Sequence, residues 1–130
     1  MSEPVWIEEQ ETLLFHERLL VQHGGAVGVR DKGLLASALA RPKQQAAYAD
    51  MPDMASLAAA YTAGIVKNHP FVDGNKRTGF LVGILFLEMN GYRFTASQEM
   101  AANAVIMLAA GDLDERGYAD FLTANTAAID

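Results

Sequence analysis

Cysteine is absent from this chain of 130 residues, which excludes a disulfide framework, a cysteine-based zinc site and thiol catalysis. Positive charge is also scarce, because 10 Lys and Arg stand against 16 Asp and Glu and the formal net charge is −6. A general nucleic-acid binder needs a basic face, so we expect no direct contact with nucleic acid. Strand signals are nearly absent and are confined to residues 27–30 and 92–95.

A long hydrophobic run is missing as well. The longest strongly apolar stretch, residues 79–89, contains Glu88 and is too short to span a bilayer. The first residues, MSEPVWIEEQE, are acidic and do not have the basic and apolar regions of a signal peptide. We therefore expect a soluble, cytoplasmic protein without a membrane partner. Its length is that of one domain, 1–130.

Helical periodicity dominates what is present, and capping residues divide it into about six helices. These are expected at residues 7–22, 31–40, 53–68 and 75–90, then from Thr95 or Ser97 to 111, and from Asp112 or Asp114 through Leu122. The sequence predicts a compact all-α single domain in which the third and fourth helices run antiparallel around a loop at 69–75.

Three details of these helices are specific expectations. The second helix should end near Ala40, because Arg41 precedes Pro42, and residues 43–52 should form a looser connection or flap. The fourth helix is apolar on all sides, so we expect it to be the central helix. Thr95 and Gln98 have the spacing of a capping box.

One segment, HPFVDGNKRT at residues 69–78, differs from the rest of the chain. It lies at a loop-to-helix junction, where free backbone N–H groups and the helix dipole attract anions. Gly74 lets the backbone approach a ligand, and Asn75 can cap or donate from its amide. Lys76 and Arg77 oppose the dipole in the first turn, which is understandable if a phosphate binds there.

The remaining residues of the segment complete a candidate site. Asp73 can hold Mg²⁺ beside a phosphate, directly or through water. His69 is free to act as a general base near neutral pH. Phe71 is the apolar residue expected to anchor the loop in the core. The combination in one loop favours a functional site.

Structural interpretations remain open for each part. A histidine before proline is commonly a helix C-cap, Asp-Gly-Asn is commonly a turn, and Lys-Arg is commonly a solvated face. The segment is not a Walker P-loop, since the glycine pattern and a preceding strand are missing. His16, His23 and His69 lack the spacing of an H-E-x-x-H zinc site, and we expect the first two to be partly buried helix residues.

The string HPFVDGNKR resembles the Doc (death-on-curing) branch of the Fic/Doc superfamily, whose pattern is H-x-F-x-[DN]-[AG]-N-K-R. The AMP-transferring branch has H-x-F-x-[DE]-G-N-G-R-x-x-R instead. Lys76 stands where that pattern has its second glycine, and Phe80 stands where it has its final arginine. Residues 23–42 and 85–94 are also similar to the Doc flanks.

The resemblance implies an all-α Fic-type fold and transfer of the γ-phosphoryl of ATP, with Mg²⁺, to a threonine hydroxyl of elongation factor Tu. It implies that His69 is the catalytic base, Phe71 the loop anchor and Asp73 the acidic residue associated with Mg²⁺. It also implies that Asn75, Lys76 and Arg77 bind phosphate. In the family, a side chain at the Lys76 position makes ATP bind in the reverse sense.

The resemblance also predicts a partner. Many Fic proteins carry an inhibitory helix with the pattern [ST]-x-x-x-E-[GN], and no glutamate of this chain fits it. Restraint should then come in trans from an antitoxin, bound in an apolar groove lined by the first helix and residues 43–52. Two alternatives remain: a Fic-type AMP or nucleotidyl transferase, and a non-catalytic module that binds a nucleotide or antitoxin.

Overall fold

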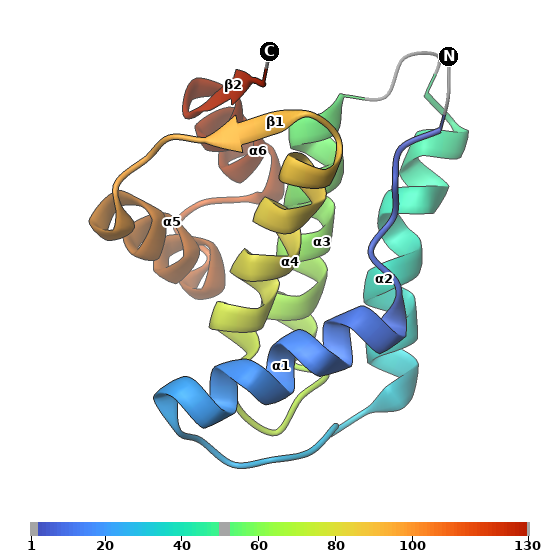
Figure 1. Ribbon diagram of the computed structural model, residues 1–130, viewed down its shortest axis with the longest axis vertical. Coiled ribbons are helices and arrows are strands. Elements are labelled where there is room, and N and C mark those ends of the chain that lie inside the picture. Colours follow the sequence, from blue (N-terminus) through green and yellow to red (C-terminus); the bar gives the residue numbers. More distant parts are fainter. Residues whose placement is uncertain (1–2, 50–52, 130) are drawn as a thin grey trace.

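Six helices and two short strands make up residues 3–49 and 53–129, the part of the chain that the computed structural model describes (Figure 1). The elements are α1 Glu9–His23, α2 Lys32–Ala47, α3 Met54–Asn68, α4 Asn75–Met89, β1 Tyr92–Phe94, α5 Gln98–Ala110, α6 Glu115–Ala124 and β2 Thr126–Ala128. The expected all-α fold is confirmed. In the described residues, no helix combines the length and apolar character needed to cross a membrane.

The central helix is α3, which corrects the expectation that α4 has this place. Figure 1 shows α3 and α4 side by side, with α2 on one side and α5 on the other. Residues 57–66 of α3 are all buried, whereas α4 leaves Leu81, Ile84 and Leu85 half-buried. Small side chains make this possible, because α3 is rich in alanine and its neighbours can approach from all sides. The apolar composition of α4 alone could not reveal this difference.

Two glycines of α4 allow the closest approach to α3. A Cβ atom on Gly79 would lie 2.9 Å from Val66 Cγ2, and one on Gly83 would overlap the Thr62 hydroxyl. The Thr62 hydroxyl itself donates to the Gly79 carbonyl at 2.8 Å. The α3–α4 pair therefore forms a rigid frame, and both ends of the loop at 69–74 are attached to it.

The second helix continues through Pro42, so the expected end before it is wrong. An interior proline removes one helical hydrogen bond and costs about 3 kcal/mol. Here the ring is buried, and the burial of its apolar surface opposes this cost. Arg41 pairs with Glu115 at 2.8 Å, and Lys43 pairs with Glu8 at 2.7 Å. Tertiary contacts therefore override the local preference of the residue before proline.

The segment expected as a loose connection or flap is mostly helical. Residues 43–47 form the end of α2, and residues 48–49 follow it. Residues 50–52 lie outside the described part of the chain, so the expectation is overturned only for 43–47.

Local capping set most helix starts as expected. The side chains of Asp31, Asp53, Ser97 and Asp114 each accept a hydrogen bond from a backbone N–H in the first turn of α2, α3, α5 and α6, respectively. The Thr95–Gln98 capping box is wrong, because Ser97 is the cap and the Thr95 hydroxyl donates to the Asn125 carbonyl.

The extended segment at 92–95 forms β1, which pairs antiparallel with β2, with Tyr92 opposite Ala128 and Phe94 opposite Thr126. The strand β2 was not expected, because three residues after a helix carry no local strand signal. The segment at 27–30 contributes an isolated bridge, Val29 with Phe71.

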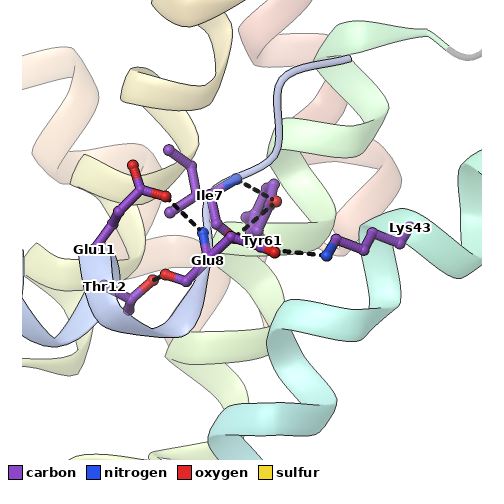
Figure 2. A network of polar contacts seen from close by, with 6 residues as sticks. All are labelled: Ile7, Glu8, Glu11, Thr12, Lys43 and Tyr61. Carbon is purple, nitrogen blue, oxygen red and sulfur yellow. Dashed lines mark hydrogen bonds and ion pairs between the residues drawn. The ribbon is translucent and has the colours of Figure 1, made fainter. Parts of the chain in front are cut away.

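The first helix begins at Glu9, two residues later than expected, because Tyr61 binds the chain before it (Figure 2). The Tyr61 hydroxyl accepts from Ile7 N–H at 2.9 Å and donates to Ile7 C=O at 3.3 Å. Both groups are buried, so the pair satisfies polar atoms that would otherwise be costly in the core. Glu8 N–H donates to the Glu11 carboxylate at 3.0 Å and caps the helix start.

Alkaline pH should break the hydrogen bonds between the Tyr61 hydroxyl and the backbone of Ile7. Burial raises the pKa of Tyr61 to about 12, and burial also raises the pKa of Tyr118 to about 12. A raised pKa in the folded state means that this stabilisation is complete below pH ~10 and is lost as the pH rises through about 12. Spectrophotometric titration of the phenolates should show a component near pH 12 that shrinks in Tyr61→Phe. An unchanged component in that variant would contradict the assignment.

Candidate active site

The loop between α3 and α4 begins at His69, which ends α3 in a left-handed conformation with φ 50° and ψ 57°. Among the described residues, it is the one non-glycine residue with positive φ. Such a conformation costs of order 1–3 kcal/mol and persists where the surroundings impose it. The turn leaves the His69 side chain exposed to solvent at the mouth of the loop.

A strap formed by residues 24–31, between α1 and α2, lies along this loop. Arg30 N–H and Asp31 N–H both donate to the Pro70 carbonyl, at 2.7 and 3.0 Å. Val72 N–H donates to the Gly28 carbonyl at 3.0 Å. Figure 1 shows the strap passing next to the loop at the end of the α3–α4 pair. The loop is therefore held by a segment roughly 40 residues away in the chain.

Arg30 fixes the end of α3 with its side chain. Its Nε donates to the His69 carbonyl at 2.6 Å, and its Nη2 donates to the Asn68 carbonyl at 2.8 Å. The last carbonyls of a helix have no partners within the helix and carry its negative dipole end, so a guanidinium suits this place. Arg30 could not be predicted from the sequence, because no neighbouring residue indicates that it contacts the carbonyls of Asn68 and His69.

Replacing Arg30 should loosen the turn at His69. Arg30→Ala removes two hydrogen bonds from a charged donor, and we expect a loss of about 1–3 kcal/mol and a fall of several degrees in Tm. Arg30→Lys keeps the charge but cannot serve both carbonyls in the same way, so it should recover less than half of the loss. Thermal unfolding measures both. A Tm for Arg30→Ala equal to that of Arg18→Ala, an exposed control on α1, would contradict this role.

The centre of the loop is buried and tightly bonded. Phe71 is fully buried. The side chain of Asn75 accepts from Phe71 N–H and donates to Phe71 C=O, both at 3.0 Å. The amide of Asn75 is thus engaged with the loop backbone. Phe71 and the Asn75 side chain hold the turn in a conformation that could bind a phosphate. Asn75 then offers its backbone N–H at the start of α4.

Asp73 carries an exposed carboxylate whose two oxygens accept from different parts of the chain. Ala26 N–H donates to Oδ2 at 3.2 Å, and Gly74 N–H donates to Oδ1 at 2.9 Å. These backbone hydrogen bonds lower the pKa of Asp73, and the positive charge of Arg77 lowers it further. The carboxylate is therefore ionised and oriented, with lone pairs remaining on both oxygens. One such carboxylate beside a phosphate site fits Mg²⁺, which keeps several waters and phosphate ligands.

Gly74 is the N-cap of α4, with φ 78° in the left-handed region that favours glycine. Lys76 and Arg77 follow in the first turn, and both are exposed. Within the described residues, neither has an acidic partner within 4 Å. The first turn of α4 thus offers two cations, free N–H groups and a positive dipole end to an anion.

Phe80, one turn further along α4, is half-buried and packs against the core. Its ring packs edge-on against Phe94 with 5.8 Å between centroids, and Phe94 packs against Phe121 in the same way. The position at which the AMP-transferring pattern has an arginine therefore serves packing in this chain.

The structure brings the exposed members of the site together on one loop and one helix turn. His69, Asp73, Lys76 and Arg77 all reach solvent there, while Phe71 and Asn75 support the loop from within. An exposed imidazole, an oriented carboxylate and a helix start suited to an anion are the groups that a transfer to a hydroxyl would use.

Comparison with known proteins agrees with this geometry. Residues 6–87 match the sequence model of the Fic/DOC family, and they include the whole site. The chain is similar to "Protein kinase doc" of Escherichia phage P1, with 29% identity over 116 residues covering 89% of this chain and 91% of that protein. It is also similar to "Toxin Doc" of Mycolicibacterium smegmatis, with 40% identity over 77 residues covering 58% of this chain and 59% of that protein. The chain therefore belongs to the Fic/DOC family.

Proposed function

We propose that this protein is a cytoplasmic toxin of the Doc type that acts as a protein kinase. It transfers the γ-phosphoryl of ATP to a threonine hydroxyl of elongation factor Tu and so arrests translation. The observation that carries the proposal is the first turn of α4, where Lys76 and Arg77 lie exposed beside the oriented carboxylate of Asp73. The similarity to a phage protein named a protein kinase supports the reaction type.

In this mechanism His69 accepts the proton of the target hydroxyl as its oxygen forms a bond to the γ-phosphorus. The bond between that phosphorus and the bridging oxygen breaks, and ADP leaves with the electron pair. Arg77, Lys76 and the backbone N–H groups of α4 stabilise the charge that develops on the phosphoryl oxygens. Asp73 would hold Mg²⁺, which neutralises phosphate charge when bound.

Two positions favour phosphoryl transfer over AMP transfer. Lys76 places a cationic side chain where the AMP-transferring pattern has glycine, so the space for phosphates is smaller. Phe80 removes a cation and turns the position into core. A nucleotidyl transferase is the alternative, and the mass added to a target distinguishes the two.

We further propose that an antitoxin restrains the enzyme in trans, as the name of the mycobacterial relative suggests for a toxin. A shallow depression of about 390 Å³ lies between the start of α1 and α2 and is a candidate for its docking. Its lining is Glu8, Glu9, Gln10, Ala36, Leu39, Ala40 and Lys43. This differs from the expected groove lined by the first helix and residues 43–52, because four of the seven lining residues are polar and, of the described residues 43–49, only Lys43 takes part.

The deciding experiment is intact-mass analysis of elongation factor Tu after incubation with the protein and Mg-ATP. A single phosphoryl increment is expected. An adenylyl increment would overturn the kinase assignment and support AMP transfer. If neither increment appears on this factor, phosphoproteomic analysis of a cell lysate treated in the same way tests for another target. The absence of any new phosphorylated protein would then contradict kinase activity.

A further inference from the structure

His16 lies on α1, more than 50 residues before the loop, and yet its side chain contacts the centre of the loop. It is buried, with 5% of its surface exposed. Its imidazole ring stacks on the Phe71 ring with 3.8 Å between centroids and 10° between planes. Such a parallel contact at van der Waals distance fixes the plane of Phe71 as well as its position.

The same ring makes a hydrogen bond to the backbone beside the candidate metal residue. His16 Nε2 lies 2.8 Å from the carbonyl oxygen of Asp73. A carbonyl oxygen can only accept, so Nε2 carries the proton and donates. The carboxylate of Asp73 is held from the other side by the N–H groups of Ala26 and Gly74. Asp73 is thereby fixed at both its main chain and its side chain.

The His16 ring also lies next to Gly74. A Cβ atom at Gly74 would lie 3.6 Å from Nε2 and from Cδ2 of His16, which is an ordinary van der Waals distance, so the ring faces the N-cap of α4. One side chain thus contacts Phe71 and the main chain of Asp73 and lies next to Gly74, and these three residues lead the loop into the first turn of α4.

His16 can hold the loop only if α1 is itself held in place, and contacts at the beginning of α1 do this (Figure 2). Tyr61 of the central helix binds both backbone groups of Ile7, and Lys43 of α2 pairs with Glu8. The helix that carries His16 is therefore tied to α3 and α2 at its start and to the loop through His16.

We propose that His16 is a positioning residue for the transfer reaction: it holds the main chain at Asp73 and the ring of Phe71, so that the carboxylate stays aligned with the first turn of α4. The role rests on the proposed function, because it is defined by the reaction at this loop. His16 does not reach solvent or the phosphate site itself, and it acts through the loop.

Two substitutions separate its contacts. His16→Phe keeps an aromatic ring for stacking and loses the donor. His16→Gln loses the ring but can place an amide N–H near the position of Nε2. His23→Gln is the matched control, since His23 is an exposed histidine at the end of the same helix. Each variant is compared with the parent for Tm, for kcat and KM with Mg-ATP, and for amide hydrogen exchange in the loop.

We expect His16→Phe to lower kcat at least tenfold, with less than a threefold change in KM for ATP and Tm within a few degrees of the parent. His16→Gln should restore kcat to within about threefold, and His23→Gln should match the parent. Equal losses in His16→Phe and His16→Gln that follow a fall in Tm would show a merely structural role. A kcat for His16→Phe within twofold of the parent would also overturn the proposal.

Hydrogen exchange keeps the two proposals distinguishable. The N–H groups of Ala26 and Val72 bond across the strap and the loop, and both should exchange at least tenfold faster in His16→Phe. This readout needs no catalysis. A parent that transfers nothing would refute the proposed function alone, whereas unchanged exchange in His16→Phe would refute the role of His16.

Discussion

His69→Ala should abolish transfer to the target, with a loss of about 10²–10⁴-fold in rate, the range typical of a positioned general base. The exposed imidazole of His69 is held at the mouth of the loop by a left-handed turn, and Arg30 fixes its carbonyl. Alanine removes the proposed proton acceptor and keeps the backbone groups that Arg30 contacts. Intact-mass analysis of elongation factor Tu with Mg-ATP measures the loss directly.

His23→Ala provides the control, because it removes an exposed histidine outside the loop. Growth arrest on expression should likewise persist in that control and disappear in His69→Ala. If His69→Ala remained as inhibitory to growth as the parent, the protein would be a binding module without catalysis. A left-handed alanine is strained, so the Tm of His69→Ala must be compared with that of the parent.

Arg77→Ala should reduce kcat/KM for Mg-ATP more than tenfold, which corresponds to about 1.4 kcal/mol or more of transition-state stabilisation. Arg77 lies exposed in the first turn of α4, where a guanidinium can bind two phosphoryl oxygens at once. Its charge also lowers the pKa of Asp73, although the backbone hydrogen bonds from Ala26 and Gly74 lower that pKa more.

Arg77→Lys tests the geometry of the cation, because it keeps the charge but not the planar fork. We expect its activity to lie between those of the parent and Arg77→Ala. Arg93→Ala, an exposed arginine on β1, should leave activity unchanged. Activity of Arg77→Ala within twofold of the parent would refute the role given to this residue.

Local chemistry predicted much of the fold, and for a physical reason. A cap such as Asp31 or Asp114 accepts a hydrogen bond from an N–H three residues further along, so the cap can be predicted from adjacent residues. The same holds for the turn between α3 and α4, where the exposed members of the site lie within nine residues. The roles of His69, Asp73, Lys76 and Arg77 remain predictions that the experiments above test.

The incorrect expectations share the opposite cause. Pro42 lies inside a helix where its ring is buried and where the preceding Arg41 reaches Glu115, which lies 74 residues later. The strand β2 forms because it pairs with β1. The helix α3 is central because its small side chains let other helices pack closely against it, and the sequence does not show which helices these are. Each outcome depends on contacts between distant segments, which local propensity cannot weigh.

By itself the sequence determined the helical class, most of the caps, the family resemblance and the loop to which we assign the chemistry, because these depend on neighbouring residues. Only the tertiary structure decided how that loop is held. His16 and Arg30 contact it across 57 and 39 residues of chain. Neither side chain is marked by its neighbours in the sequence, because its partner in the loop comes next to it only when the chain folds.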